Sequence, residues 1–298
     1  MSYLTVFSTM KPFNDTHIAM IQRNAVNSWC KMGPEVKILL VGDEPGVKEI
    51  AQAAGVHHEP EVARNEGGTP LISSIFAIAE SSSESPYLMY MNADIIMTSD
   101  SMRALKIVAN RIESFLMVGQ RTDLDLTATI DFNEDWENNL RITARDRGRI
   151  HPTGIDYFLF SRGLYPSIPD FAIGRSGWDN WMIYNVRKRG LPVIDATTDV
   201  MAIHQNHDYK HLPDGQHHYD LNESKRNVQL AGGDDHMYII LDANRALIKN
   251  RLRAPRISIV RILRCIERKL MDLHGKPNDH RWTFIRRFRR FRRRLMGG

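Results

Sequence analysis

Apolar runs alternate with amphipathic stretches through the first half of the chain, and this alternation constrains the fold more than any other feature of the sequence. Short apolar, β-branched runs bounded by turn residues are typical of buried strands, and apolar residues at helical spacing indicate helices that cover a sheet. Strands that alternate with helices form a mostly parallel sheet. The sequence therefore predicts an α/β fold with a mixed, mainly parallel, Rossmann-like sheet flanked by helices.

The alternation is regular as far as Gly119 and then breaks up. The expected strands before it are 3–8, 36–41, 87–92 and 115–119, and the expected helices are 17–31, 45–54, 70–80 and 99–110. A charged stretch at 131–149 follows, and the later expected elements are strands 157–161, 192–195 and 200–204 and a helix over 178–189. The irregular second half predicts that the sheet becomes mixed there.

Net charge divides the chain into two parts. The segment 245–298 holds 18 Arg and Lys residues against three acidic ones, a net charge of +15, whereas 1–244 carries 22 basic and 32 acidic residues, a net charge of −10. Such an asymmetry indicates two bodies with different partners. We predict a catalytic domain over 1–244 and a basic amphipathic helical extension over 245–298.

Two apolar stripes at helical spacing lie in this extension. The one among arginines is typical of a helix on an anionic membrane surface, with a docking or oligomer helix as the alternative. It consists of Phe284, Phe288, Phe291 and Leu295. The other predicts a helix packed on the catalytic domain. It consists of Ile259, Leu263, Ile266, Leu270 and Leu273.

Cysteine usage and the N-terminal sequence bear on the compartment. Cys30 and Cys265 are too few for a disulfide framework, which favours a reducing setting. The first residues, MSYLTVFSTM, lack the basic and apolar regions of a signal peptide, and no apolar run approaches the roughly 20 residues of a membrane-spanning helix. We expect a cytoplasmic protein, peripheral at the inner face of the membrane where its last helix binds lipid.

The first candidate motif is Asn92-Ala93-Asp94, which directly follows a hydrophobic strand. Open α/β sheets bind ligands at the carboxyl ends of their strands. Two oxygen-bearing side chains separated by one small residue can share a hard divalent cation, which would bridge the phosphates of a nucleotide diphosphate. An Asx turn or a helix cap accounts for the same residues equally well.

The second candidate motif is GRSGWDNW, residues 174–181. Glycines on both sides of Arg175 predict a pliable loop that closes over a ligand. Asp179 falls at the start of a helix, where a carboxylate is favoured as the anion and suits a general base. Trp178 and Trp181 would offer flat surfaces to a sugar ring. An N-cap followed by two core tryptophans is the competing interpretation.

The third candidate is His204, which a buried strand delivers into a polar loop as a metal ligand or phosphate contact. We expect most of the histidines after it to be ordinary surface residues. They are His207, His211, His217 and His218. A zinc site is disfavoured because no cysteine pair accompanies them and no HExxH spacing occurs.

Two smaller motifs fit the same site. Residues 64–70, RNEGGTP, precede a helix, so the backbone amides and the Arg64 guanidinium would hold the ribose or phosphate of a nucleotide. The predicted nucleotide contacts in this segment are Arg64, Asn65, Gly67, Gly68 and Thr69. Asp43, at the end of the second strand, would accept a hydrogen bond from a base. Each segment also reads as a simple turn.

Read in order, these segments resemble the GT-A fold glycosyltransferases, and more narrowly a family of nucleotide-diphospho-sugar transferases of bacteria and plants. The strings that carry the resemblance are QRNAVNSW, RNEGGTPLISSIF, YMNADII, GIDYFLF, FAIGRSGWDNWMIY and AIHQNHDY, within roughly residues 3–219. The superfamily's DxD-type motif, Gly-rich loop, acidic base and late histidine match Asn92 to Asp94, Gly154 or Gly174 to Gly177, Asp179 and His204. Asn92 replaces the first Asp of the usual motif, and Asp179 stands alone in place of an acidic pair.

The resemblance implies transfer of a sugar from a nucleotide-diphosphate donor to a hydroxyl acceptor of a growing glycan or lipid-linked saccharide. Mn or Mg would bind Asp94, Asn92 and His204, and Arg175 would join the nucleotide contacts. Asp179 would be the base of an inverting reaction, and Asp156 would orient the acceptor. The predicted acceptor contacts are Gly154, Trp178, Asn180 and Trp181.

Three alternatives compete with this interpretation. A sugar-phosphate nucleotidyltransferase shares the sheet but is expected to carry a Gly-rich, Arg-containing loop after its first strand, which 7–12 (FSTMKP) does not supply. A nucleic-acid-binding protein would use the arginines but leave the acidic part of the chain without a role, so nucleic acid is not an expected partner. A catalytically inactive binding protein stays open because Asn92 departs from the motif.

Overall fold

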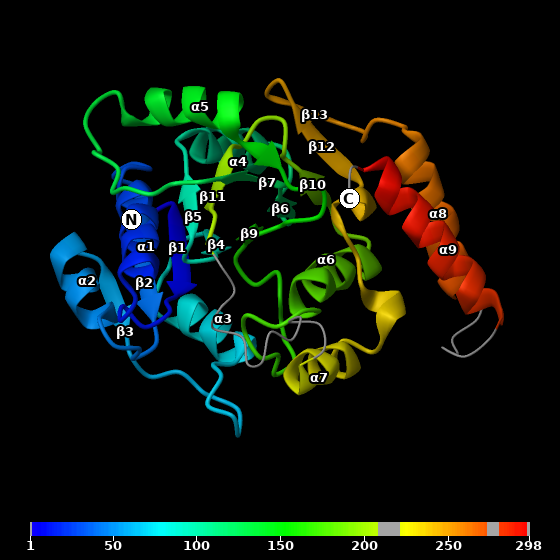
Figure 1. Ribbon diagram of the computed structural model, residues 1–298, viewed down its shortest axis with the longest axis horizontal. Helices are drawn as coiled ribbons and strands as arrows, with labels where there is room; N and C mark the ends of the chain where they lie inside the picture. The colour runs from blue at the N-terminus through cyan, green and yellow to red at the C-terminus, as the bar shows by residue number, and fades with distance from the viewer. Residues whose placement is uncertain (1, 208–220, 273–279, 297–298) are drawn as a thin grey trace.

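The computed structural model describes residues 2–207, 221–272 and 280–296. Its centre is a twisted sheet of nine strands (Figure 1). In spatial order these are β13 (Arg251–Arg253), β12 (Arg245–Ile248), β10 (Val193–Asp195), β6 (Leu116–Val118), β9 (Tyr157–Ser161), β4 (Tyr87–Met91), β1 (Leu4–Thr9), β2 (Val36–Val41) and β3 (His57–Glu59). Only β9 and β13 run antiparallel to their neighbours. The predicted mixed, mainly parallel sheet is confirmed.

Helices cover both faces of this sheet because successive strand residues point to opposite sides. In β1, Val6 packs toward one face and Phe7 toward the other, and both are fully buried. The first face carries α1 (Thr16–Cys30), α2 (Val47–Ala54) and α4 (Asp100–Ala109), and the second carries α3 (Ile72–Ser81) and α6 (Trp178–Lys188). The apolar runs of the sequence therefore form two core clusters, one on each face of the sheet, in a three-layer arrangement.

A second, four-stranded sheet adjoins the first. It comprises β5 (Ile95–Met97), β11 (Ala202–Gln205), β7 (Arg121–Leu124) and β8 (Arg149–Ile150). Helix α5 (Trp136–Arg147) covers it, with Trp136, Leu140 and Ala144 at a spacing of four residues. The sequence prediction missed this helix because those three residues are its only buried ones in an otherwise charged stretch.

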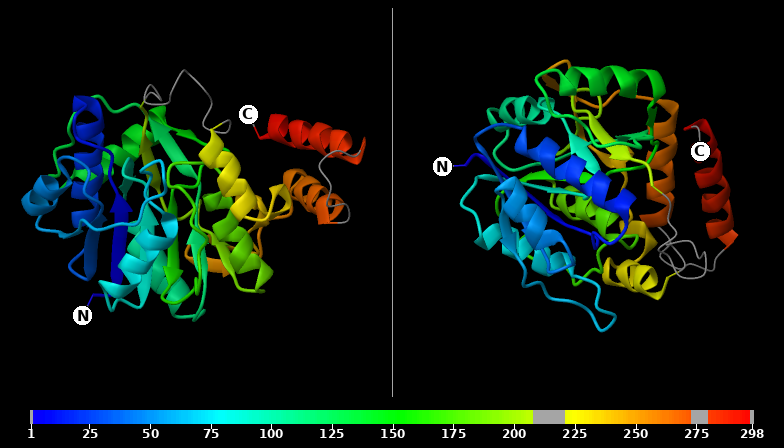
Figure 2. Two further views of the ribbon diagram at one scale, coloured as in Figure 1. Left: turned by 90° about the horizontal axis from the view of Figure 1, so that it is seen from below. Right: turned by 60° about the vertical axis from the view of Figure 1, so that its left-hand side comes forward.

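The chain continues from the large sheet into two long helices. After α7 (Asn222–Leu230) and the short 3₁₀ helices η3 (Asp234–His236) and η4 (Ile240–Asp242), strands β12 and β13 complete the sheet. Helices α8 (Ile259–Asp272) and α9 (His280–Leu295) follow, side by side (Figures 1 and 2). The boundary predicted between 244 and 245 thus falls directly before a strand of the central sheet, and the helical extension begins at Ile259. Within the described ranges, no helix combines the length and the apolar character needed to cross a bilayer.

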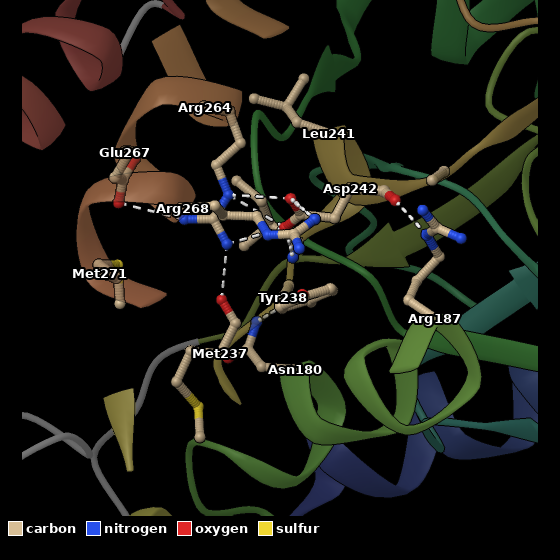
Figure 3. Close-up of polar contacts among 12 residues, drawn as sticks. Asn180, Arg187, Met237, Tyr238, Leu241, Asp242, Arg264, Glu267, Arg268 and Met271 are labelled. Carbon is tan, nitrogen blue, oxygen red and sulfur yellow. Dashed lines mark hydrogen bonds and ion pairs between the residues drawn. The ribbon is translucent and has the colours of Figure 1, made fainter. Parts of the chain in front are cut away.

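Helix α8 docks on the domain through its charged face. Arg264 is buried and donates to both carboxylate oxygens of Asp242, at 2.8–3.2 Å, and to the carbonyl of Met237 (Figure 3). Ile259 and Ile266, from the stripe predicted to pack on the domain, are exposed instead. Helix α8 therefore packs on the domain as predicted, but through ion pairs rather than through these isoleucines. Leu273 of the predicted stripe lies outside the described residues.

This buried pair yields a stability prediction. Replacing Asp242 with Ala leaves the Arg264 cation buried without its main partner, which should lower the free energy of unfolding by about 3–5 kcal/mol. Asp146→Ala, at an exposed position of α5, should change it by less than about 0.5 kcal/mol. Urea denaturation compares the two. A loss below about 1 kcal/mol in Asp242→Ala would show that the ion pair does not hold α8 in place.

Candidate functional site

The strand order reverses between β1 and β4. From β1 the sheet runs outward through β2 and β3 on one side, and the chain then returns to β4 on the other side of β1. In open α/β sheets, ligands bind in the crevice outside the carboxyl ends of the strands at such a point. Lys11 follows β1 and Asn92 to Asp94 follow β4, so the predicted motif lies where this rule expects a ligand.

Three side chains that suit a metal ion converge there. The carboxylate of Asp94 and ring nitrogens of His204 and His207 all lie within 4.8 Å of one another. His207 Nε2 is 3.2 Å from Asp94 Oδ2, and His204 Nε2 is 3.6 Å from the same oxygen. Strand β11 pairs His204 with Ile95 of β5, which places it beside the turn after β4. The structure thus brings the predicted Asp94 and His204 together and adds His207, which was expected at the surface.

Charged neighbours hold this cluster in place. His204 Nδ1 makes a hydrogen bond with Asn206 Oδ1 at 3.2 Å and lies 3.1 Å from the charged Asp123 Oδ1, so its other nitrogen is directed at Asp94. Arg121 pairs with Asp123 at 2.8 Å and donates to Asp156 Oδ2 at 2.9 Å. Carboxylate partners of this kind fix the orientation of a ligating imidazole. The ring of His204 is therefore fixed from both sides.

The protonation of the cluster follows from its contacts. Burial alone would raise the pKa of Asp94, but hydrogen bonds from His204 and His207 outweigh it and hold that pKa well below its ordinary value. Burial lowers the pKa of His204, and Asp94 more than restores it, so the net direction is upward. An ionised carboxylate between two imidazoles is a strong attraction for a cation.

The donor set fits a divalent metal. Among the described residues, nothing donates a hydrogen bond to Asp94 Oδ1, which is buried. A buried, ionised oxygen without a donor is costly unless a ligand completes its contacts. One carboxylate and two imidazoles suit Mn, Fe or Zn more than Ca. The residues present therefore match a site for a transition metal.

Asn92 and Asp156 lie near the cluster and are hydrogen-bonded to each other. The Asn92 amide donates to Asp156 Oδ1 at 2.6 Å and accepts from the Tyr90 hydroxyl at 3.0 Å. Asp156 directly precedes β9, which pairs with β4, and its pKa is raised by burial more than Arg121 lowers it. The amide of Asn92 is thus engaged by protein groups, and its predicted role as a metal ligand stays a prediction.

Asp179 sits at the first turn of α6. Gly177 caps this helix at φ 107°, a conformation that favours glycine, and its N–H donates to Asp179 Oδ1 at 3.3 Å. The ring of Trp178 meets that of Tyr90 edge-on at 5.2 Å, which joins the start of α6 to the end of β4. Burial raises the pKa of Asp179 to about 6, with the charge of Asp156 adding to the effect. A half-buried carboxyl with a pKa near neutrality is suited to accept a proton.

The predicted nucleotide contacts group around another carboxylate, Glu223 at the start of α7. Asn65 and Thr69 donate to Glu223 Oε1, both at 2.7 Å, and Arg175 donates to Oε2 at 2.6 Å. The turn at 65–69 and the loop at 174–177 are therefore linked, as a shared site requires. Arg64 is paired with Asp43, at 2.5 Å, and with Glu44, at 2.8 Å.

The predicted acceptor contacts are mostly packed against protein groups. Trp178 and Trp181 are buried, Trp181 against Phe171, and Asn180 donates to the carbonyl of Tyr238 at 2.7 Å. A Cβ on Gly154 would lie 3.0 Å from Arg121 Nε, so this glycine leaves room for Arg121 to reach Asp156. These residues contact other protein groups, and their direct contact with an acceptor stays a prediction.

Comparison with known proteins yields matches among solved structures. S. aureus TarS with UDP-GlcNAc is 11% identical, with a TM-score of 0.44 over 78% of this chain and 65% of that one. Glucosyl-3-phosphoglycerate synthase of Mycobacterium tuberculosis with Mn²⁺, UDP and glucosyl-3-phosphoglycerate is 12% identical, with a TM-score of 0.46 over 87% of this chain and 88% of that one. The mannosyltransferase PcManGT of Pyrobaculum calidifontis with GDP-Man and Mn²⁺ is 14% identical, with a TM-score of 0.43 over 70% and 58%.

This chain therefore spans less than two thirds of the matched TarS and PcManGT chains. No family model matches it, and no curated protein does either. At these levels of similarity the matched structures assign no activity to this chain.

Sequence reasoning missed several residues of the site: Lys11, Arg121, Asp123, His207 and Glu223. Burial lowers the pKa of Lys11, and the nearby charge of Asp94 opposes this shift. The position of Lys11 after the first strand was the one available signal. Asp123 reaches the site because β7 pairs with β11. The sequence of a four-residue polar strand does not predict such a pairing.

Proposed function

We propose that the chain is a glycosyltransferase that takes a nucleotide-diphosphate sugar with a divalent metal. One observation carries the proposal: Asp94, His204 and His207 lie close enough together to hold a metal ion at the switch point of an open α/β sheet. Asp156 interacts electrostatically with both Asp94 and Asp179, and burial raises the pKa of Asp179 to about 6. A cation at these strand ends would offset the negative charge of a bound diphosphate. A proton acceptor would take the proton of an attacking hydroxyl.

Each residue group would have a distinct role. Asp94, His204 and His207 would hold Mn rather than Mg, because two imidazoles suit a transition metal, and Asp123 would orient His204. The bound metal would neutralise the negative charge of the departing diphosphate. Lys11 would add a positive charge on the β1 side. The 64–69 turn with Asp43 and Arg175 would contact the nucleoside, with Glu223 holding the two segments together.

Asp179 would be the general base of an inverting transfer. It would take the proton of an acceptor hydroxyl as that oxygen attacks the anomeric carbon. The bond from this carbon to the diphosphate oxygen would break, and its electron pair would leave with the nucleoside diphosphate. Asp156, tied to Arg121 and Asn92, would orient the acceptor, which we propose is a glycan or lipid-linked saccharide in the cytoplasm.

A donor screen tests this function. The full chain with Mn²⁺ is incubated with UDP- and GDP-sugars, and release of the nucleoside diphosphate is measured with and without added saccharide acceptors. We expect release with one donor class that stops in excess chelator and is restored by Mn²⁺. Release of pyrophosphate from a nucleoside triphosphate and a sugar phosphate would instead identify a nucleotidyltransferase. Binding of a metal ion without release of a nucleoside diphosphate from any donor would contradict the proposal.

A further inference from the structure

Helix α8 buries charged side chains and leaves part of its apolar surface exposed. Its charged side chains Arg264 and Glu267 are buried, and Arg268 stacks on the ring of Tyr238 at 4.1 Å (Figure 3). A separate stripe of three isoleucines, spaced three and four residues apart, faces solvent, and these residues are 42–63% exposed. It consists of Ile259, Ile262 and Ile266. Because a surface helix ordinarily buries its apolar stripe, these isoleucines indicate a face made for a partner.

Helix α9 exposes a second apolar stripe. From Thr283 onward, where its side chains are described, Ile285 and Arg292 are buried, and Arg289 and Arg292 both donate to Glu267 of α8, at 2.8 and 2.9 Å. The side chains of the stripe are 46–59% exposed. They are Phe284, Phe291 and Leu295. The contact with α8 therefore leaves the predicted aromatic stripe largely uncovered.

The two stripes face the same side. Helices α8 and α9 lie side by side and run antiparallel (Figures 1 and 2), with Glu267 against Arg292. Ile266 directly precedes Glu267, and Phe291 directly precedes Arg292. Each is therefore rotated by about 100° around its helix axis from the residue that makes the contact. In an antiparallel pair, these rotations carry both side chains to the same side. Arg268, one position after Glu267, is turned the opposite way and rests on the domain.

The six side chains therefore form one apolar surface that points away from the catalytic domain. We call this the outer face: Ile259, Ile262, Ile266, Phe284, Phe291 and Leu295. Exposed arginines on α9 accompany it, Arg287 and Arg294 among them, and the segment 245–298 carries a net charge of +15. The outer face is therefore apolar and belongs to a strongly cationic segment.

We propose that the outer face is a two-helix docking surface for an anionic lipid bilayer. Its apolar side chains would enter the acyl boundary, while the arginines would pair with acidic headgroups. Two helices fixed to the domain by Arg264 and Asp242 would also set the orientation of the enzyme on the membrane. A second copy of the chain would bring two strongly cationic segments together, and a nucleic acid would leave the isoleucines uncovered, so charge and apolarity together favour lipid.

Vesicle flotation of the full chain tests the proposal, whether or not the chain transfers sugar. We expect the protein to float with vesicles of phosphatidylcholine and phosphatidylglycerol and to remain unbound with phosphatidylcholine alone. Ile262→Glu combined with Ile266→Glu, which leaves α9 and every arginine in place, should lower the bound fraction by roughly tenfold or more. Ile142→Glu, at a 48% exposed isoleucine of α5, should float like the wild type.

Several results would overturn the proposal. One is equal binding to neutral and anionic vesicles, and another is unchanged flotation of the double variant, which would assign lipid binding to the arginines alone. A wild-type dimer that the double variant dissociates, without flotation, would assign the outer face to self-association. A shift of RNA without flotation would assign it to nucleic acid. Thermal unfolding of both variants at the wild-type midpoint verifies that they fold.

Discussion

Replacing Asp179 with Asn should reduce sugar transfer by about a hundredfold to ten-thousandfold while donor and metal still bind. The amide has nearly the size of the carboxyl but cannot accept a proton from an acceptor hydroxyl. Burial and the charge of Asp156 oppose ionisation of Asp179, so the neutral amide should also fit the fold without loss of thermal stability at pH 8. Initial rates and unfolding temperatures, measured on the same preparation, separate the two effects.

Asp146→Asn is the matched control, because Asp146 is an exposed carboxylate on α5. It should leave both quantities unchanged. Transfer at the wild-type rate by Asp179→Asn would show that another group is the base. A rate loss accompanied by a fall in the unfolding temperature would show that the substitution acts on the fold rather than on proton transfer.

The pH dependence of the wild type has a definite sign. The pKa of Asp179 is about 6, so at lower pH its carboxyl is protonated and cannot act as a base. The transfer rate should therefore rise from pH 5 to pH 7. The same raised pKa means that the folded state binds more protons than the unfolded state between about pH 4 and 6, so this group's contribution to stability falls over that range. Asp179→Asn should remove both slopes. A rate profile that is flat from pH 5 to 7 would contradict the assignment.

Replacing Asp94 with Ala should raise the dissociation constant for Mn²⁺ by roughly a hundredfold or more, because the variant loses the only carboxylate of the metal cluster. Asp123→Asn keeps all three ligands but loses the charge that orients His204, so we expect a smaller loss of about tenfold. Titration followed by the Mn²⁺ electron paramagnetic resonance signal measures both. The order of the two losses distinguishes a ligand from a residue that positions one.

His57→Ala is the control for these titrations, since His57 is partly exposed and lies on β3, away from the cluster. Its affinity for Mn²⁺ should equal that of the wild type. Equal affinity in Asp94→Ala would show that the cluster is a hydrogen-bonded group within the fold and that metal binds elsewhere.

The sheet was predictable because its strands are short apolar runs separated by clear turns. Strands 36–41 and 157–161 were predicted with the bounds that the structure has. The second sheet was not, since β7 and β8 are polar and exist only through pairing with strands far along the chain. Local pattern carries no information about such pairing.

The site followed the same division. Asp94 and His204, which the structure brings together, each follow or end a predicted strand, where side chains meet ligands. The role of Asp179 as the base stays a prediction. Asp123 and Arg121 come from a strand without an apolar pattern, and His207 looked like one of several loop histidines until the fold placed it against Asp94. The orientation of α8 could not be predicted either, because a stripe of isoleucines does not tell which partner covers it.

The proposed function depends on metal and nucleotide binding together at the carboxyl ends of β1 and β4. Thermal unfolding with UDP or GDP, in the presence and absence of Mn²⁺, tests it most directly, because a ligand of the native state raises the unfolding temperature by mass action. We predict a rise that requires nucleotide and Mn²⁺ together and is lost in Asp94→Ala. A rise of equal size in excess chelator, or none with any nucleoside diphosphate, would contradict the account.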